Sequence, residues 1–326
     1  MSRVFSGIQP SGELHIGNYL GAVKNWADIQ HRHPSFFCVV DYHAITVAYE
    51  PAQLRARTRD LARTLFAAGL DPAVCHVFVQ STVPEHTELQ WIFNTVTPLG
   101  ELERQTQFKD KSQKQEQVMA GLLNYPVLQA ADILLYRADV IPVGEDQVQH
   151  LELSRVIARN WNARFGEFFP EPKPLLTPTR RILGLDGQAK MSKSMNNTIG
   201  LLDDSDTTWA KLRPAVTDPQ RVRKSDPGRP EVCNVYTLHT AFSDAATQDD
   251  VAAKCRSAAW GCMDCKKVLH EAMERELVPI RTRAQQLRDE PARLDDALAD
   301  GARQARAVAR ETIAHVKEAM GLASAG

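Results

Sequence analysis

Two lysines with hydroxyl groups beside them form a pattern that could bind phosphate. Lys190 and Lys193 are three positions apart, Met191 follows the first, and Ser192 and Ser194 flank the second. Ammonium groups and hydroxyl donors on a flexible loop can neutralise and orient a polyphosphate. The spacing therefore predicts a cationic loop that closes on phosphate groups, and the alternative is an ordinary solvated loop.

A second candidate anion site lies near the N-terminus. Residues 4–22 read VFSGIQPSGELHIGNYLGA, so a short apolar strand runs into a Gly- and Pro-rich turn, and helical spacing begins at Leu14. The N–H groups and the positive dipole end of a helix start favour phosphate. His15 lies in the first helical turn, and Gly17 leaves space for a flat group to approach the backbone. For His-x-Gly alone, a solvent-facing histidine in an ordinary turn is the alternative.

A third candidate lies in the apolar stretch of residues 120–136, which predicts a buried helix with an internal proline. Tyr125, Gln129 and Asp132 are spaced i, i+4 and i+7, so they share one face of that helix. A buried carboxylate needs a donor, because leaving it unpaired is costly. Asp132 is therefore either bound to a structural partner or kept for a donor on a ligand.

Apolar runs separated by helical spacing place these candidates on a parallel α/β fold. Residues 35–40 and 74–80 are continuous apolar runs, and residues 52–69 between them have helical spacing. A strand, a helix and a second strand in this order are typical of parallel sheets buried on both faces. His43 follows the first run, and the polar residues 144–147 follow another short apolar strand. Both therefore lie at carboxyl ends of strands, where open parallel sheets bind ligands.

The bulk composition excludes some functional classes. The chain has 326 residues, of which 43% are apolar and 24% are charged, enough for a large core and two domains. Lys and Arg total 39 against 40 for Asp and Glu, so there is no global basic field and any nucleic-acid contact must be local. The N-terminus lacks a signal sequence, and no apolar run approaches the ~18 residues of a membrane span. These observations predict a soluble cytoplasmic protein without membrane association.

Three short motifs carry a resemblance to a known family. The sequence has neither a P-loop nor a G-x-G-x-x-G fingerprint, so ATP binding would need another device. PSGELHIGN at residues 10–18, GEDQ at 144–147 and KMSKS at 190–194 resemble, in this order, the signature motifs of class I aminoacyl-tRNA synthetases. The sequence from about Arg3 to Leu322 is similar to the bacterial tryptophanyl branch. Asn18 departs from the final histidine of the general HIGH motif but matches the HIGN of this branch.

The resemblance implies a domain organisation. A Rossmann-like parallel-sheet catalytic domain is expected over residues 1–194, and a helical anticodon-binding domain over residues 195–295. Residues 296–326 are expected to form a C-terminal helix that returns to the catalytic domain. Within the helical domain, periodicity predicts a long helix over residues 249–283.

The resemblance also implies two neighbouring ligand sites. The implied catalytic residues are Lys190, Lys193, Lys111 and His15. The three lysines are implied to stabilise charge that moves onto pyrophosphate, and His15 is implied to bind ATP at the helix start. The residues implied to bind ATP, accompanied by Mg²⁺, are Gln9, Pro10, Ser11, Gly17, Asn18, Gly144, Glu145, Asp146, Ile182, Lys190, Met191, Ser192, Lys193 and Ser194. The residues implied to bind tryptophan are Phe5, His43, Tyr125, Gln129, Asp132, Ile133, Ile141, Val143 and Gln147. Among them, Asp132 is implied to accept the indole N–H.

An enzyme of this branch activates L-tryptophan with ATP to tryptophanyl-adenylate and transfers it to the terminal adenosine of tRNA(Trp), and it is a homodimer. Residues 211–230 carry six Lys or Arg against two Asp, and they would contact the tRNA backbone unless they form a solvated surface loop. Two other functions stay open. A tyrosine-specific relative typically has Tyr at the position of Phe5, and a non-catalytic tRNA-binding paralogue would not need all three motifs.

Six cysteines without a secretory signal indicate reduced thiols or metal ligands rather than disulfides. Cys233, Cys255, Cys262 and Cys265 have the spacing C-x21-C-x6-C-x2-C, which predicts a four-thiolate metal site, with four unlinked cysteines as the alternative. Because only one pair is close, the spacing favours a 4Fe–4S cluster over Zn²⁺. The set also resembles that of a subset of bacterial tryptophanyl-tRNA synthetases with such a cluster. The cluster would hold in place the helices on which the lysine pair at 266–267 faces tRNA.

Overall fold

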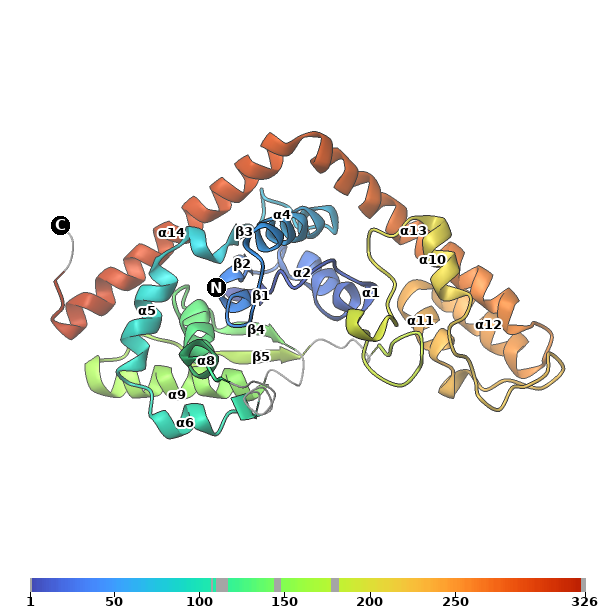
Figure 1. Cartoon of the computed structure of the whole chain (residues 1–326), viewed down its shortest axis with the longest axis horizontal. Coiled ribbons are helices and arrows are strands. Elements are labelled where there is room, and N and C mark those ends of the chain that lie inside the picture. The colour runs from blue at the N-terminus through green and yellow to red at the C-terminus, as the bar shows by residue number, and fades with distance from the viewer. Residues whose placement is uncertain (1, 107, 110–116, 144–147, 177–181, 324–326) are drawn as a thin grey trace.

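The predicted parallel α/β fold is confirmed. The computed structural model describes residues 2–106, 108–109, 117–143, 148–176 and 182–323. Within these residues, five strands form one parallel sheet in the order β3-β2-β1-β4-β5 (Figure 1). The strands are β1 (Val4–Ile8), β2 (Ser35–Val39), β3 (His76–Val79), β4 (Val140–Val143) and β5 (Lys173–Leu176).

Neighbouring strands are aligned so that their carboxyl ends meet at one edge of the sheet. Ile8 pairs with Val39 across β1 and β2, and Val143 pairs with Leu176 across β4 and β5. The chain order reverses between β1 and β4, since β2 and β3 lie on one side of β1 and β4 and β5 on the other. Such a reversal opens a crevice at the carboxyl ends of the two strands, where α/β proteins bind ligands. The sheet therefore directs the residues after β1 and β4 toward one crevice.

Side chains of β2 alternate between two cores, one on each face of the sheet. Phe37 and Val39 belong to the first core, whereas Phe36 and Cys38 belong to the second. The helices of the α/β part that pack in the first core are α1 (Ile16–Asn18), α2 (Lys24–Ile29) and α4 (Pro51–Ala67). Those in the second are α5 (Glu85–Asn94), α6 (Leu99–Glu103), α8 (Ala120–Leu134) and α9 (Val148–Phe165). Burial on both faces explains why β2 is a continuous apolar run.

The chain after the sheet forms a helical region that two long helices connect back to the α/β part (Figure 1). Its shorter helices are α10 (Ser205–Leu212), α11 (Asn234–Phe242) and α12 (Ala245–Arg256). The first long helix, α13 (Cys262–Asp289), reaches α4, where Arg283 Nε donates to Ala67 O at 2.7 Å. The second, α14 (Pro291–Met320), then runs across the α/β part to the C-terminus.

Gly301 allows α14 to approach the sheet closely. A Cβ at this position would lie 2.1 Å from Val77 O on β3, so any side chain would push the helix away. Farther along the same helix, Arg306 Nε pairs with Glu85 Oε1 on α5 at 2.9 Å. The C-terminal helix is therefore fixed to both β3 and α5.

Several elements differ from the sequence expectations. The single helix expected over residues 249–283 is two helices, because Ala258 adopts a φ of 57° and the chain turns before α13 begins. The sequence predicts no strand at β5, which contains Pro174, and the proline is tolerated there because β5 is an edge strand of the described sheet. α14 begins at Pro291, ahead of its expected start. None of the helices in the described ranges is long and apolar enough to cross a membrane.

Candidate functional site

His15 ends the loop after β1 and begins the first helical segment. The Asn18 N–H donates to His15 Nδ1 at 3.2 Å, and the His15 N–H donates to Asn18 Oδ1 at 3.3 Å. Burial, together with the positive charge of Lys193, lowers the pKa of His15 to about 4. The ring of His15 is therefore neutral, and its Nδ1 acts as an acceptor. Its Nε2–H group can still donate a hydrogen bond to a ligand.

The lysine loop (residues 190–201) is fixed to this first loop by backbone hydrogen bonds. The Ile16 N–H donates to Ile199 O at 3.0 Å, and the Leu201 N–H donates to Leu14 O at 2.8 Å. The two sequence patterns predicted to bind phosphate are far apart in the chain, and these bonds make them neighbours in space.

The base of the lysine loop is closed by further contacts. Leu183 pairs with Lys190 in an antiparallel bridge. Asn197 Oδ1 accepts the Ser192 N–H at 2.8 Å, and the hydroxyl oxygens of Ser192 and Ser194 are 2.9 Å apart. The loop therefore has a defined shape that presents its lysines and serines together.

Lys193 lies against the turn that precedes His15. A Cβ on Gly12 would lie 2.6 Å from Lys193 Nζ, and a Cβ on Gly17 would lie 3.3 Å from Met191 Cβ. Burial lowers the pKa of Lys193, as expected for an ammonium group that is partly removed from water. The ammonium group of Lys193 and the Nε2–H group of His15 thus lie at the loop after β1, and together they can bind an anionic group.

The other residues predicted to bind ATP lie at the same edge where the structure describes them. The Ser11 N–H donates to Gln9 O at 2.8 Å, which tightens the turn around the buried Pro10. Ile182 is half-buried and packs on the first core just before the lysine loop. The predictions that lie outside the described residues are those for Lys111, Gly144, Glu145, Asp146 and Gln147.

Asp132 on α8 is the centre of a buried polar cluster and is 1% exposed. Its Oδ2 accepts from His43 Nε2 at 2.7 Å, and His43 lies on α3 (Asp41–Ala44) directly after β2. Its Oδ1 accepts from Gln80 Nε2 at 2.6 Å and from His86 Nδ1 at 2.7 Å. Burial alone would raise the pKa of Asp132, but the charge and hydrogen bond of His43 and the bond from His86 hold it below its usual range. Asp132 is therefore ionised, and it has structural partners.

Apolar and aromatic side chains predicted to contact tryptophan surround this cluster. Phe5 stacks on Tyr136 with ring centroids 5.5 Å apart, and the ring of Tyr125 lies edge-on to that of His43 at 6.3 Å. The other predicted side chains on this side of the sheet are Ile133, Ile141 and Val143, with Gln129 half-buried on α8. The structure therefore brings the described part of the predicted set together.

Sequence reasoning missed three residues that complete the cluster, which are Gln80, His86 and Tyr136. Gln80 follows β3 directly, so the rule that selects His43 after β2 could have selected it as well. His86 lies in α5, which the sequence did not predict, and Tyr136 follows an apolar helix, so neither gave a signal.

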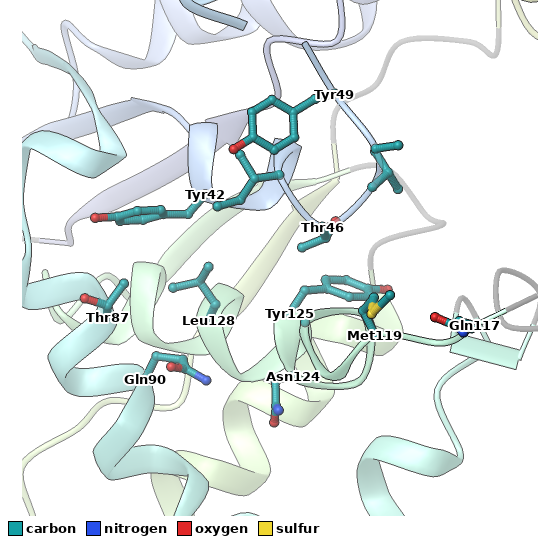
Figure 2. A pocket seen from close by; sticks show the side chains of 14 residues that line it. Tyr42, Thr46, Tyr49, Thr87, Gln90, Gln117, Met119, Asn124, Tyr125 and Leu128 are labelled. Carbon is teal, nitrogen blue, oxygen red and sulfur yellow. The ribbon is translucent and has the colours of Figure 1, made fainter. Parts of the chain in front are cut away.

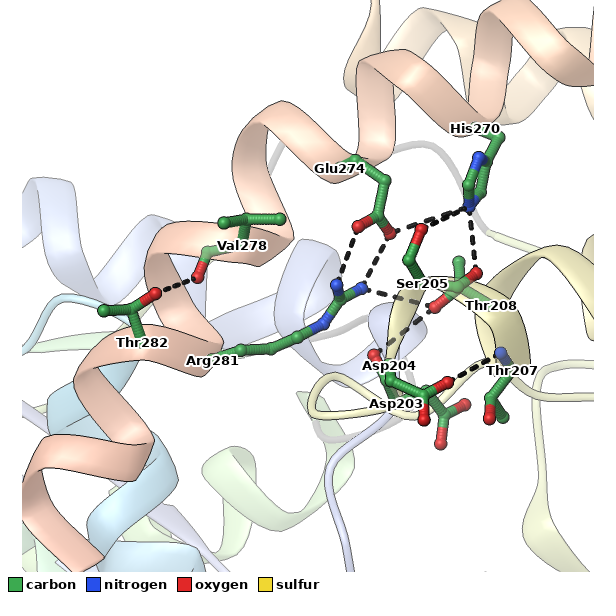
Figure 3. A network of polar contacts seen from close by, with 10 residues as sticks. All are labelled: Asp203, Asp204, Ser205, Thr207, Thr208, His270, Glu274, Val278, Arg281 and Thr282. Carbon is green, nitrogen blue, oxygen red and sulfur yellow. Dashed lines mark hydrogen bonds and ion pairs between the residues drawn. The ribbon is translucent and has the colours of Figure 1, made fainter. Parts of the chain in front are cut away.

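Polar contacts fix α10, which follows the lysine loop, to α13 (Figure 3). Arg281 Nη1 and Nη2 pair with the two carboxylate oxygens of Glu274 at 2.7 and 2.8 Å, and Arg281 also donates to Thr208 Oγ1 at 3.3 Å. His270 Nε2 lies 3.1 Å from Ser205 O at the start of α10. The lysine loop is thereby connected to the long helix that joins the helical region to the α/β part.

The four cysteines with metal-ligand spacing lie near one another in the helical region. Burial and the negative charges of the other three thiols raise the pKa of Cys265 to about 12. Arg221 Nη1 donates to Cys255 Sγ at 3.8 Å. In the part of the chain that the structure describes, no three Cys, His, Asp or Glu side chains are arranged as a metal site. All four cysteines of this set have free thiols, and they are Cys233, Cys255, Cys262 and Cys265.

The expectation that Lys266 faces tRNA is wrong. Lys266 is 5% exposed, and its Nζ donates to Arg213 O at 2.7 Å and to Ala215 O at 2.6 Å. The ammonium group ties α13 to the chain that follows α10. Lys267 beside it is exposed.

A cavity of about 1000 Å³ opens between residues 42–49, α5 and the start of α8 (Figure 2). Exposed apolar side chains line it, with Val47 48%, Tyr49 47% and Met119 59% exposed. Trp91 on α5 is 72% exposed. Large apolar side chains gathered at a surface hollow are typical of an interaction surface.

Comparisons with known proteins extend over nearly the whole chain. The family model described as tRNA synthetases class I (W and Y) matches residues 1–278. A tryptophan–tRNA ligase from Deinococcus radiodurans is 54% identical over 326 residues, which cover 98% of this chain and 99% of that protein. Tryptophan–tRNA ligase 2 from Streptomyces avermitilis is 48% identical over 328 residues, which cover 98% of this chain and 96% of that protein.

A solved structure agrees with these relatives. The crystal structure of tryptophanyl-tRNA synthetase from Campylobacter jejuni, complexed with ADP and tryptophan, matches with a TM-score of 0.90 and 36% identity. The match covers 98% of this chain and 100% of that chain, so it includes the α/β part and the helical region together.

Proposed function

The chain belongs to the class I tRNA synthetases of the tryptophan and tyrosine branch and acts as a tryptophan–tRNA ligase. We propose that ATP and tryptophan bind to two separate groups of residues in its α/β part. The loops around His15 and Lys193 bind ATP, and the cluster around Asp132 binds tryptophan. The observation that carries this proposal is the buried, ionised carboxylate of Asp132 among aromatic and apolar side chains. A ligand with a flat apolar body and one N–H donor, such as an indole, suits that environment.

The first reaction is an in-line attack of the tryptophan carboxylate on the α-phosphorus of ATP. A carboxylate oxygen forms the new bond to phosphorus while the bond to pyrophosphate breaks, and Mg²⁺ bound to ATP shields the phosphate charge. Lys193, held beside His15, neutralises the charge that moves onto pyrophosphate, with Lys190 and Lys111 in the same role. A hydroxyl of the terminal adenosine of tRNA(Trp) then attacks the tryptophanyl-adenylate and releases AMP.

Exchange of labelled pyrophosphate into ATP tests the proposed first step. The chain should catalyse exchange with tryptophan and not with tyrosine, because its full-length relatives are tryptophan–tRNA ligases and Phe5 stands where the tyrosine-specific relative typically has Tyr. Exchange with tyrosine alone would indicate the tyrosine-specific relative. Exchange with neither amino acid would indicate a non-catalytic tRNA-binding paralogue.

A second copy of this chain is proposed to cover the cavity beside Tyr49, which makes the enzyme a homodimer. The exposed side chains of Val47, Tyr49 and Met119 support this, because leaving such groups in water is unfavourable. Light scattering should give the mass of a dimer for the native chain and of a monomer for Val47→Glu/Met119→Glu. Val222→Glu is a matched control, because Val222 is 84% exposed and lies in the helical region. A native monomer contradicts the proposal.

The helical region is proposed to bind the anticodon of tRNA(Trp). One cation of the basic stretch at residues 211–230 forms an ion pair inside the protein, since Arg229 pairs with Asp218 at 2.6 Å. Arg223 and Lys224 are exposed, and so is Lys267 on α13. These exposed cations can contact phosphate, which makes the predicted tRNA affinity fall as salt rises.

A 4Fe–4S cluster is proposed at the four cysteines, with Zn²⁺ as the alternative. The donor set fits in kind, since burial and, to a smaller extent, the charges of the other three thiolates raise the pKa of Cys265, and a bound cation would relieve that repulsion. When bound, the cluster supplies a structural link rather than chemistry on tryptophan or ATP. Cys233 precedes α11, and Cys262 begins α13, so the thiols would join the ends of separate helices.

A further inference from the structure

We propose that His86 and Gln80 position the carboxylate of Asp132 so that its Oδ2 atom alone receives the indole N–H. Tyr136 supports His86 in this task. The inference rests on the proposed function, because it concerns the tryptophan cluster, and it assigns positioning roles to residues that do not themselves contact the substrate.

Oδ1 of Asp132 is fully occupied by two donors. It accepts from Gln80 Nε2 at 2.6 Å and from His86 Nδ1 at 2.7 Å, and a carboxylate oxygen has about two lone-pair sites. The orientation of the Gln80 amide is fixed, because its Oε1 accepts the Tyr42 N–H at 3.1 Å and only Nε2 is then left for Asp132. The residues Asp132, Gln80 and His86 are each at most 1% exposed, so water does not compete for these bonds.

His86 is held in one orientation from its other side. Its Nε2 lies 2.8 Å from the Tyr136 hydroxyl, and burial raises the pKa of Tyr136 well above its usual value, so that the hydroxyl stays protonated. Because the ionised carboxylate of Asp132 can only accept, Nδ1–H of His86 donates to it, and Nε2 shares the second hydrogen bond with the Tyr136 hydroxyl. Tyr136 also stacks on Phe5 with ring planes within 8° of parallel, so it supports a wall of the proposed pocket as well.

Oδ2 of Asp132 has a free acceptor site. Among the described residues it accepts one side-chain donor, His43 Nε2, at 2.7 Å. One lone pair of Oδ2 is therefore left for a ligand donor. Since the bonds to Oδ1 prevent the carboxylate from rotating, they decide which oxygen faces the ligand, and their loss should weaken recognition of the N–H group in particular.

The test compares tryptophan with its benzothiophene analogue, which has sulfur in place of the indole N–H. Pyrophosphate exchange gives KM and kcat for both substrates with the native chain, His86→Leu and His86→Asn. His86→Leu should raise KM for tryptophan about tenfold and KM for the analogue less than about twofold, because only tryptophan uses Oδ2. His86→Asn should stay within about threefold of the native KM, since its amide nitrogen can replace Nδ1 as the donor.

The ratio of the KM values for tryptophan and its analogue shows whether His86 positions Asp132 or only fills space. Equal rises in KM for tryptophan and the analogue would show that His86 only fills space, and they would overturn the inference. If His86→Leu does not fold, Tyr136→Phe keeps the ring and removes only the hydroxyl. A loss of about threefold confined to tryptophan supports the inference, and unchanged selectivity contradicts it. A native chain that does not activate tryptophan instead refutes the proposed function.

Discussion

Gly12 and Lys193 are in direct contact across two loops that are about 180 positions apart in the sequence, with the lysine Nζ 2.6 Å from where a Cβ on Gly12 would stand. The glycine leaves the space that the ammonium group occupies. Its φ of 129° also belongs to a region that other residues adopt only with strain. A single position therefore controls both the shape of the first loop and the placement of the lysine.

Replacing Gly12 with alanine should impair catalysis and stability together. The new methyl group displaces Lys193 Nζ, and the backbone strain costs about 1–3 kcal/mol. Chemical denaturation and pyrophosphate exchange measure the two effects. Gly166→Ala is the control, because Gly166 also has a positive φ, of 106°, and nothing lies within 4 Å of where its new methyl group would stand. If both variants lose stability but keep full exchange, the contact with Lys193 has no catalytic value.

Lys193 should act mainly in the transition state of adenylate formation. Lys193→Ala is expected to lower kcat at least about a hundredfold while KM for tryptophan changes little, because the charge on pyrophosphate develops only as the bond breaks. Steady-state exchange kinetics check this, with Lys254→Ala as a control because Lys254 pairs with Asp250 on the exposed side of α12. A raised tryptophan KM with unchanged kcat would make Lys193 a ground-state contact instead.

The sequence predicted the chemical groups of the site better than their contacts. His15 and Lys193 were both identified from local spacing, yet their proximity depends on the pairing of residues 199–201 with 14–16. Asp132 could be identified as a buried carboxylate that needs a donor, but not the partners that satisfy it. His86 lies on the same short helix as the buried Leu89 and Phe93, but no local pattern indicates that this helix packs beside Asp132, and only the fold brings the two side chains together.

The errors in the fold have physical causes of the same kind. The sequence predicts no strand at β5, because proline is rare inside a sheet, and β5 tolerates Pro174 as an edge strand of the described sheet. Lys266 is expected to face tRNA as part of the lysine pair that follows the last cysteine, and an exposed lysine would be the ordinary case. It is buried here because the carbonyl groups of Arg213 and Ala215, at the end of α10, accept its hydrogen bonds. Neither partner lies near Lys266 in the sequence.

Asp132→Asn should selectively weaken the use of tryptophan. Removing the negative charge while keeping the shape leaves the indole N–H poorly paired, and we expect a cost of about 2 to 4 kcal/mol in kcat/KM. Tryptophan-dependent exchange measures this, and circular dichroism checks that the variant is folded. A loss below about threefold in a folded variant would refute the assignment of Asp132 to the indole N–H.

His15 should titrate far below an ordinary histidine. Burial and the charge of Lys193 lower its pKa to about 4 from the usual 6.5, so the unfolded chain binds a proton first as pH falls. His15 therefore reduces the stability of the fold progressively between about pH 6.5 and 4 and has no such effect above that range. The ring resonance, assigned by its loss in His15→Gln, should follow this titration in NMR spectra. Lys193→Met should raise the pKa only in part, because burial is the larger cause, and an ordinary titration in the native chain contradicts the buried, Lys193-facing geometry.

The four-cysteine site should contain iron and sulfide after anaerobic purification. About four of each per chain, with the brown colour of a cluster, are expected, because the single close cysteine pair favours 4Fe–4S over Zn²⁺. Cys262→Ser should lower tRNA charging much more than pyrophosphate exchange, since the thiols lie in the helical region rather than at His15 or Asp132. Cys75→Ser is the control, because Cys75 is buried in the first core beside β3 and belongs to no thiol group of this kind. Colourless protein with about one zinc per chain would replace the cluster by Zn²⁺, and colourless protein without metal would leave four reduced thiols. Equal losses of charging and exchange in Cys262→Ser would refute the separate role of the helical region.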